Sequence, residues 1–99
     1  MINPGKYYVR HPDIAWRRVE EDALLVDPRN GKIFPVNPVA ARIWELLDHR
    51  RPSDIAEILT GEFDAPPETI RHDAYEFIGR LWDANLLQEA PDLTPVIER

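Results

Sequence analysis

The first third of the chain has the pattern of short strands separated by turns. Residues 15–19 form a candidate strand, the acidic residues 20–22 a turn, and residues 23–26 a continuous apolar run of strand length. Residues 27–31, Asp-Pro-Arg-Asn-Gly, predict a second turn because Asn-Gly adopts positive φ at low cost. Extended structure resumes over residues 32–36. The pattern therefore predicts three short antiparallel strands.

Pro35 limits where the third of these strands can lie. Proline has no N–H to donate to a ladder, so we expect this strand at a sheet edge or interrupted at the proline. Alternation places Ile33 and Pro35 on one face of the strand and Phe34 and Val36 on the other.

The period changes to that of helices after residue 36. Asn37-Pro38 is a typical helix start, since asparagine caps the first turn and proline fits the first helical position. Apolar spacing extends this helix to residue 48 or 49. A second helix is predicted from Ser53-Asp54 to about Gly61, and a third from residue 65 to about residue 85.

These elements predict an α+β, winged-helix-like domain, with a three-stranded antiparallel sheet followed by three helices. We expect residues 13–88 to form this domain, because 99 residues are enough for one domain and too few for two. Residues 1–12, which contain two prolines and no regular period, are expected to be a flexible N-terminal arm. Residues 89–99 are expected to be a C-terminal tail.

The chain has no cysteine and a net charge of −6. Disulfides, thiolate metal ligands and cysteine nucleophiles are therefore excluded. The N-terminus lacks the order of a signal peptide, and no apolar run approaches the roughly 20 residues that span a membrane. We therefore expect a cytoplasmic protein with no membrane partner. The acidic charge also argues against a nucleic-acid partner, because phosphate binding depends on Lys and Arg.

Four segments, taken in order, resemble the PqqD-like family. Residues 31–48 resemble its central signature, in which a glycine turn, an aromatic-bearing strand, an asparagine cap and a helix containing Ile-Trp lead to Leu-Leu-Asp. Residues 53–59 are similar to the family's second helix, the spacing of residues 70–81 to its third, and Leu86-Leu87 to the apolar pair that follows. The similarity covers about residues 12–87. His49 stands where the family usually has glycine, which predicts a different local turn.

The resemblance implies a recognition element for ribosomally synthesised, post-translationally modified peptides. Such a domain binds the leader segment of a precursor peptide and presents it to a maturase, often a radical S-adenosylmethionine enzyme. The implied function is that of a non-catalytic adaptor with no cofactor, whose partners are the precursor peptide and the maturase.

A disordered peptide can be held by adding a strand to an exposed sheet edge. The candidate edge consists of Lys32, Ile33, Phe34, Pro35 and Val36. The third helix is the candidate second wall, and it carries a core stripe with a second apolar band beside it. Which shoulder of the helix faces the edge is left open, so the candidate residues come from both: Ile70, Arg71, Asp73, Ala74, Tyr75, Phe77 and Ile78. An exposed edge permits either a monomer or an edge-strand dimer.

The main alternative is a winged-helix transcriptional regulator that binds DNA. The basic pairs Arg17-Arg18 and Arg50-Arg51 favour it, but the third helix carries more acidic than basic side chains, which is a poor balance for a helix in the major groove. An enzyme is less favoured still, because no acid–base constellation converges. No metal site is expected, because no two of the three histidines have metal-binding spacing.

Overall fold

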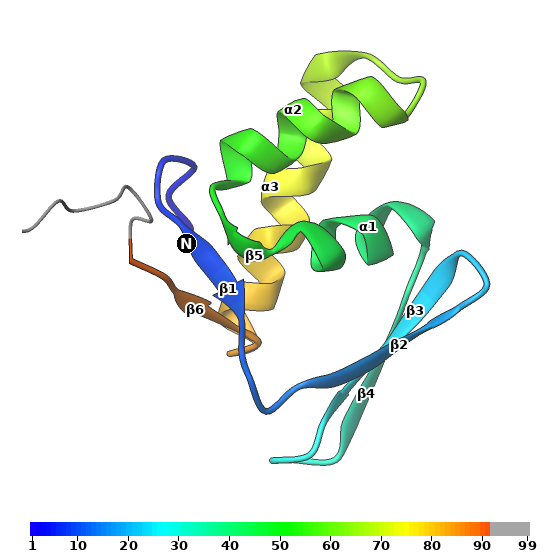
Figure 1. Ribbon diagram of the computed structural model, residues 1–99, viewed down its shortest axis with the longest axis vertical. Coiled ribbons are helices and arrows are strands. Elements are labelled where there is room, and N and C mark those ends of the chain that lie inside the picture. Colours follow the sequence, from blue (N-terminus) through cyan, green and yellow to red (C-terminus); the bar gives the residue numbers. More distant parts are fainter. Residues whose placement is uncertain (92–99) are drawn as a thin grey trace, which may run out of the picture.

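The computed structural model describes residues 1–91. Figure 1 shows the sheet β2–β3–β4 at one end of the molecule, with the three helices and a second small sheet beyond it. The elements in chain order are β1 (Tyr8–Arg10), β2 (Ala15–Val19), β3 (Asp22–Asp27), β4 (Lys32–Val36), α1 (Pro38–Leu46), β5 (Asp48–Arg50), α2 (Pro52–Glu62), α3 (Pro67–Asp83) and β6 (Leu87–Glu89). The predicted α+β class, with a three-stranded antiparallel sheet followed by three helices, is confirmed.

The sheet β2–β3–β4 has two tight hairpins and an unbroken register. Val19 pairs with Asp22 across the first turn, and Asp27 pairs with Lys32 across the second. In the second turn Gly31 has a φ of 74° and its N–H donates to the carbonyl oxygen of Asp27 at 2.9 Å. Because β3 is the middle strand, β4 pairs on one side only. It is an edge strand, as Pro35 predicts.

The second sheet, in the order β5–β1–β6, was not predicted. Its middle strand lies within residues 1–12, where the sequence suggested a flexible arm. Tyr8 is buried, and its ring packs edge-on against Trp82 with centroids 5.5 Å apart. The strand partners of β1 are residues 48–50 and 87–89, so no local pattern reveals the pairing. Of the expected tail, residues 92–99 lie outside the described residues.

The first helix starts at its predicted cap. The Asn37 side chain accepts a hydrogen bond from the N–H of Ala40 at 2.9 Å, and Pro38 occupies the first helical position. The second helix begins one residue earlier than predicted, at Pro52. There the Asp54 carboxylate accepts hydrogen bonds from the backbone N–H and the guanidinium of Arg51. His49, in β5, has a φ of 58°, which is the left-handed region that favours glycine.

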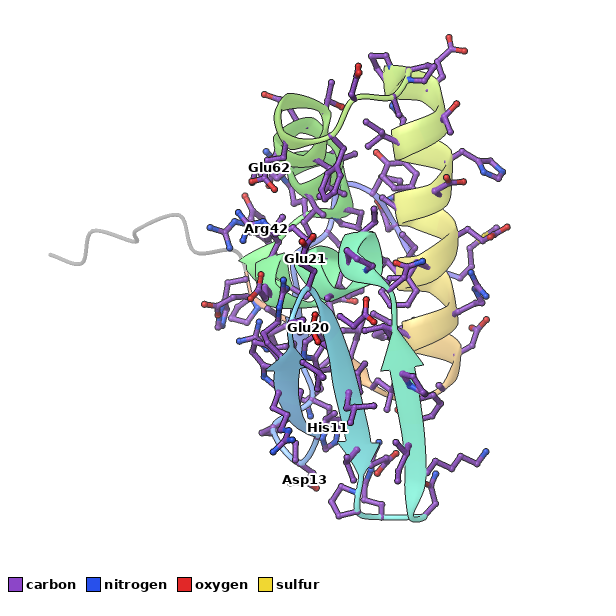
Figure 2. All side chains as sticks on the ribbon, turned by 90° about the vertical axis from the view of Figure 1, so that its right-hand side faces the viewer. His11, Asp13, Glu20, Glu21, Arg42 and Glu62 are labelled. Carbon is purple, nitrogen blue, oxygen red and sulfur yellow. The ribbon has the colours of Figure 1, made fainter. Side chains whose placement is uncertain are left out.

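The core lies where the three helices meet one another and the sheet β2–β3–β4. Its largest fully buried side chains include those of Trp44, Leu25, Ile43, Leu47 and Ile78. Outside this core, Arg42 of α1 forms a two-pronged ion pair with Glu62 of α2, with both contacts at 2.8 Å. Figure 2 shows these two side chains side by side. Burial therefore fixes α1 against the sheet, and the ion pair links it to the end of α2.

Candidate functional site

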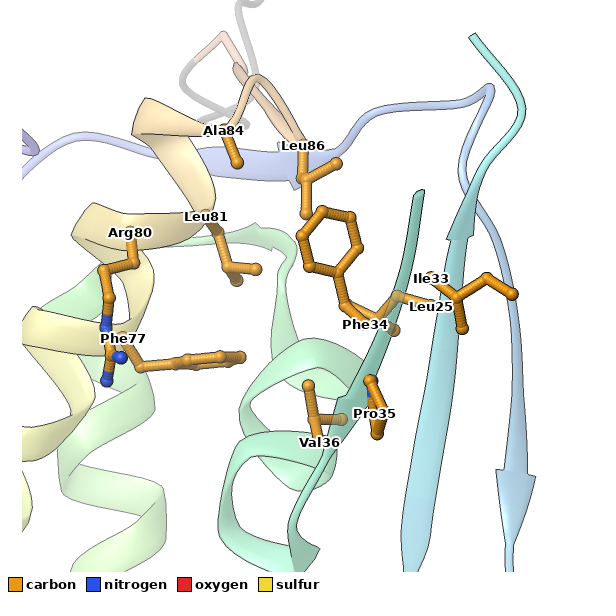
Figure 3. A pocket seen from close by; sticks show the side chains of 10 residues that line it. All are labelled: Leu25, Ile33, Phe34, Pro35, Val36, Phe77, Arg80, Leu81, Ala84 and Leu86. Carbon is orange, nitrogen blue, oxygen red and sulfur yellow. The ribbon is translucent and has the colours of Figure 1, made fainter. Parts of the chain in front are cut away.

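The free edge of β4 runs beside the C-terminal half of α3. A cleft of about 320 Å³ separates them. Figure 3 shows the ring of Phe34 and the side chain of Val36 pointing from β4 into this space, toward Phe77 and Leu81 of α3. The lining residues are Leu25, Ile33, Phe34, Pro35, Val36, Phe77, Arg80, Leu81, Ala84 and Leu86. The cleft therefore joins an unpaired strand edge to an almost entirely apolar wall.

A second hollow of about 280 Å³ continues the cleft toward the N-terminal half of α3. It shares Phe77 and Arg80 with the first, but Asp73 and Glu76 also line it. The guanidinium of Arg80 lies 3.5 Å from the Glu76 carboxylate. The cleft thus changes along its length from apolar, beside Ala84, to acidic, beside Asp73.

The structure establishes which shoulder of α3 faces the strand. Phe77 lines the cleft, and Asp73 lines its acidic continuation. Arg71 and Tyr75 line a different hollow, between α2 and α3. Ala74 and Ile78 are buried in the core.

Ile70 is also buried, at the end of α3 that lies away from the first hollow. Three residues of the α3 wall, Arg80, Leu81 and Ala84, are absent from the predicted set. They follow Phe77 by three, four and seven positions, which is the spacing of one helix face. Extending the helical spacing beyond residue 78 would therefore have predicted these three residues from the sequence.

One ion pair ties the two walls together. Asp27 is buried at the end of β3, and its carboxylate accepts hydrogen bonds from the Arg29 guanidinium at 2.8 and 2.9 Å. The same guanidinium donates to the carbonyl oxygen of Asn85, just beyond α3, at 2.7 Å. The hydrogen bonds from Arg29 lower the pKa of Asp27 below its usual value of 3.8. The β3–β4 turn is thereby held against the end of α3.

Three of the four side chains in the basic pairs have polar partners within the protein. Arg18 pairs with Glu45, and Arg51 pairs with Asp54. Arg50 donates to the carbonyl oxygen of Leu46 at the end of α1. Within residues 1–91, no group of three or more histidine or carboxylate side chains is placed to hold a metal ion. No helix in this part of the chain has the length and apolarity needed to cross a membrane.

Comparison with protein families gives a match over most of the domain. The family model of coenzyme PQQ synthesis protein D (PqqD) matches residues 22–87, two thirds of the chain. The chain belongs to the PqqD family. The matched segment begins at β3 and ends at the start of β6, so it contains the whole cleft. A comparison with curated proteins found no match.

Three solved structures share this PqqD fold. TbiB1 in complex with the TbiA(beta) leader peptide has a TM-score of 0.74 at 24% identity, covering 85% of this chain and 99% of TbiB1. Lasso peptide synthetase B1, complexed with the leader peptide, has a TM-score of 0.70 at 26% identity. The match covers 82% of this chain and 96% of the synthetase chain. The PqqD truncation of Methylobacterium extorquens PqqCD, a stand-alone recognition element for ribosomally synthesised and post-translationally modified peptides, has a TM-score of 0.72 at 22% identity, covering 89% and 95%.

Proposed function

We propose that this domain binds the leader segment of a ribosomally synthesised precursor peptide and presents it to a separate modifying enzyme. The observation that carries the proposal is the free edge of β4 lying along an apolar cleft. Two proteins that share its fold were solved with a leader peptide bound, and a third is described as a stand-alone recognition element. Membership of the PqqD family agrees with this role.

The two walls supply different parts of the binding energy. An extended peptide adds to β4 as a fourth strand, and its main-chain hydrogen bonds give affinity that depends little on sequence. Its side chains on the cleft side then pack on Phe34, Phe77 and Leu81, and burial of this apolar area gives specificity. At the acidic end, Asp73 and Glu76 favour a basic peptide residue.

The contact set that follows is narrower than the one proposed from sequence. It keeps residues 32–36 of β4 together with Asp73 and Phe77, and it adds Arg80, Leu81 and Ala84. The partner enzyme carries out the modification, and radical S-adenosylmethionine enzymes are one class of such partner. The domain acts in the cytoplasm as a non-catalytic adaptor, raising the local concentration of the substrate at that enzyme.

The test is an amide-shift titration of the ¹⁵N-labelled chain with the leader of a short precursor encoded beside its gene, and separately with a DNA duplex. We expect peptide-induced shifts on residues 32–36 and 77–84. Shifts with the duplex alone, on Arg17-Arg18 or Arg50-Arg51, overturn the proposal in favour of a DNA-binding regulator.

Two half-buried aromatic residues of α3 make a matched pair of variants. Phe77→Ala removes a cleft wall and is expected to weaken leader binding at least ~10-fold, because a buried aromatic anchor contributes more than 1 kcal/mol. Tyr75→Ala truncates the ring that lines the hollow between α2 and α3, and it should leave the affinity within about 2-fold. Equal losses in the two variants would place the peptide elsewhere.

A further inference from the structure

Beyond the second hollow, the cleft continues into a third hollow at the N-terminal end of α3. This end hollow has a volume of about 230 Å³ and lies between the first turn of α1, the α2–α3 connection and the start of α3. It shares Val39 and Asp73 with the second hollow, which in turn shares Phe77 and Arg80 with the cleft. The three hollows therefore form one trench along α3.

The end hollow combines an apolar floor with an acidic rim. The side chains of Leu59 and Ile70, which form the floor, are buried, and Phe63 beside them is half-buried. The rim carries Asp64 and Asp73, which are both exposed. None of the described residues that line this hollow is basic. The hollow therefore suits a side chain that is apolar along its length and positively charged at its tip.

The trench offers no strand edge in this part of the molecule. β4 ends at Val36, and the chain turns into α1 at Pro38. The wall opposite α3 is then the first turn of α1, which includes Val39 and Ala40. The N–H of Ala40 already donates to the side chain of Asn37 at 2.9 Å. A peptide that follows the trench beyond Val36 is therefore held there by its side chains.

The rise of α3 sets the spacing between the cleft and the end hollow. Ile70 and Phe77 are seven positions apart on the helix, which corresponds to about 10 Å at roughly 1.5 Å per residue. An extended peptide covers this distance in about three residues, at roughly 3.3 Å per residue. A peptide residue packed on Phe77 and a residue in the end hollow are therefore about three positions apart.

We propose, building on the function above, that the end hollow binds one basic residue of the leader peptide, an arginine or a lysine. Its aliphatic stem packs on Val39, Phe63 and Ile70, and its cation lies against the carboxylates of Asp64 and Asp73. The net charge of −6 adds a long-range attraction for such a residue. The accepted leader thus has a basic residue about three positions from the residue that packs on Phe77.

Replacing each basic residue of the leader used in the titration, one at a time, tests this proposal. Citrulline in place of arginine, or acetyl-lysine in place of lysine, removes the charge and keeps the stem, whereas alanine removes both. At one position we expect the dissociation constant to rise roughly 2- to 5-fold on loss of the charge and at least ~10-fold with alanine. The first increase should become smaller in 1 M NaCl, because exposed charges are screened.

The same titrations locate the sensitive residue on the protein. The parent leader should shift the amides of Val39 and of residues 63–65, and the alanine-substituted leader should not. A leader without a sensitive basic residue, or a sensitive residue that does not affect these amides, overturns the proposal. A parent leader that does not bind the chain at all overturns the proposed function itself.

Changes in the protein test whether the two carboxylates make the contact. Asp64→Asn and Asp73→Asn should each bind the parent leader roughly 2- to 5-fold more weakly, and should bind the charge-free leader as the parent chain does. Glu57→Gln is the matched control, since it removes the same charge from the exposed rim of the hollow between α2 and α3. It should leave the affinity for both leaders unchanged. Equal losses in all three variants, or losses that persist with the charge-free leader, contradict the assigned contact.

Discussion

Arg29 and Asp27 form a two-pronged ion pair that holds the β3–β4 turn against the end of α3. The guanidinium lies 2.8 Å and 2.9 Å from the two carboxylate oxygens, and its third contact is the carbonyl oxygen of Asn85 at 2.7 Å. Arginine is suited to this position because its planar fork matches a carboxylate and still has a donor to spare. The pair therefore links the two cleft walls at the end of the cleft beside Asn85.

Arg29→Ala is expected to lower the thermal midpoint and to weaken leader binding. The substitution leaves the Asp27 carboxylate buried without its main partner and frees the β3–β4 turn from Asn85. Arg17→Ala, on β2 of the same sheet, removes an exposed cation outside the cleft and serves as control. Calorimetry and the leader titration together check the prediction. Loss of stability without loss of affinity would show that the pair does not position the cleft.

The same carboxylate makes stability depend on pH in the acid range. The folded state lowers the pKa of Asp27, chiefly through its hydrogen bonds with Arg29, so folding favours the ionised form. The resulting stabilisation is complete above the unfolded pKa, near 3.8, and is lost as the pH falls through the folded value. We therefore expect the free energy of unfolding in urea to fall less between pH 6 and pH 2 in Asp27→Asn than in the parent. Glu21→Gln, in the exposed β2–β3 turn, is the control, and its free energy of unfolding should fall as much as that of the parent.

Local sequence signals predicted the positions of most strands and helices better than they predicted which strands pair with one another. The strands over residues 15–19 and 32–36 and the cap at Asn37 follow from turn, alternation and capping chemistry, which act within a few residues. The sheet β5–β1–β6 could not be found in this way, because each strand has three residues and its partners are about 40 or 80 positions away. Strand pairing at that separation depends on the packed core.

The cleft shows the same division between local and long-range information. The edge position of β4 follows from Pro35 alone, since a proline excludes the middle of a sheet. Which shoulder of α3 faces β4 depends on how deeply each side of the helix is buried against α1 and α2. Two apolar bands on one helix leave that choice open, and burial of Ile78 settles it by turning Phe77 toward the strand.

His49→Gly is expected to stabilise the domain by about 0.5–1 kcal/mol. His49 holds a φ of 58°, a conformation that is strained for a side chain with a Cβ atom and free for glycine. Its exposed contact with Asp48, at 3.1 Å, contributes little in return. Chemical denaturation measures the change. His72→Gly, in the middle of α3, should instead destabilise by about 1 kcal/mol, because glycine there has helical φ and no strain to relieve.

The pair Arg42–Glu62 should contribute a small, salt-dependent stabilisation. Both side chains are about one third exposed, so the two contacts at 2.8 Å are screened by water and ions. Glu62→Gln is expected to lower the free energy of unfolding by about 0.2–1 kcal/mol at low salt and by less in 1 M NaCl. Glu76→Gln removes the more exposed contact to Arg80, at 3.5 Å. It should lower the free energy of unfolding by less than Glu62→Gln does. A large loss that salt does not reduce would mean that Glu62 acts through packing.

Pro35 also limits pairing between two copies of the chain. A bare strand edge attracts other edges, and proteins commonly protect it with proline or by keeping the strand short. β4 has five residues, and Pro35 has no N–H to donate to another strand. Pro35→Ala should therefore increase self-association, measured by sedimentation equilibrium over increasing concentration, while Pro28→Ala should not. Added leader should dissociate the Pro35→Ala dimer, because both compete for the same edge. A dimer that persists with bound leader would instead lie on another surface.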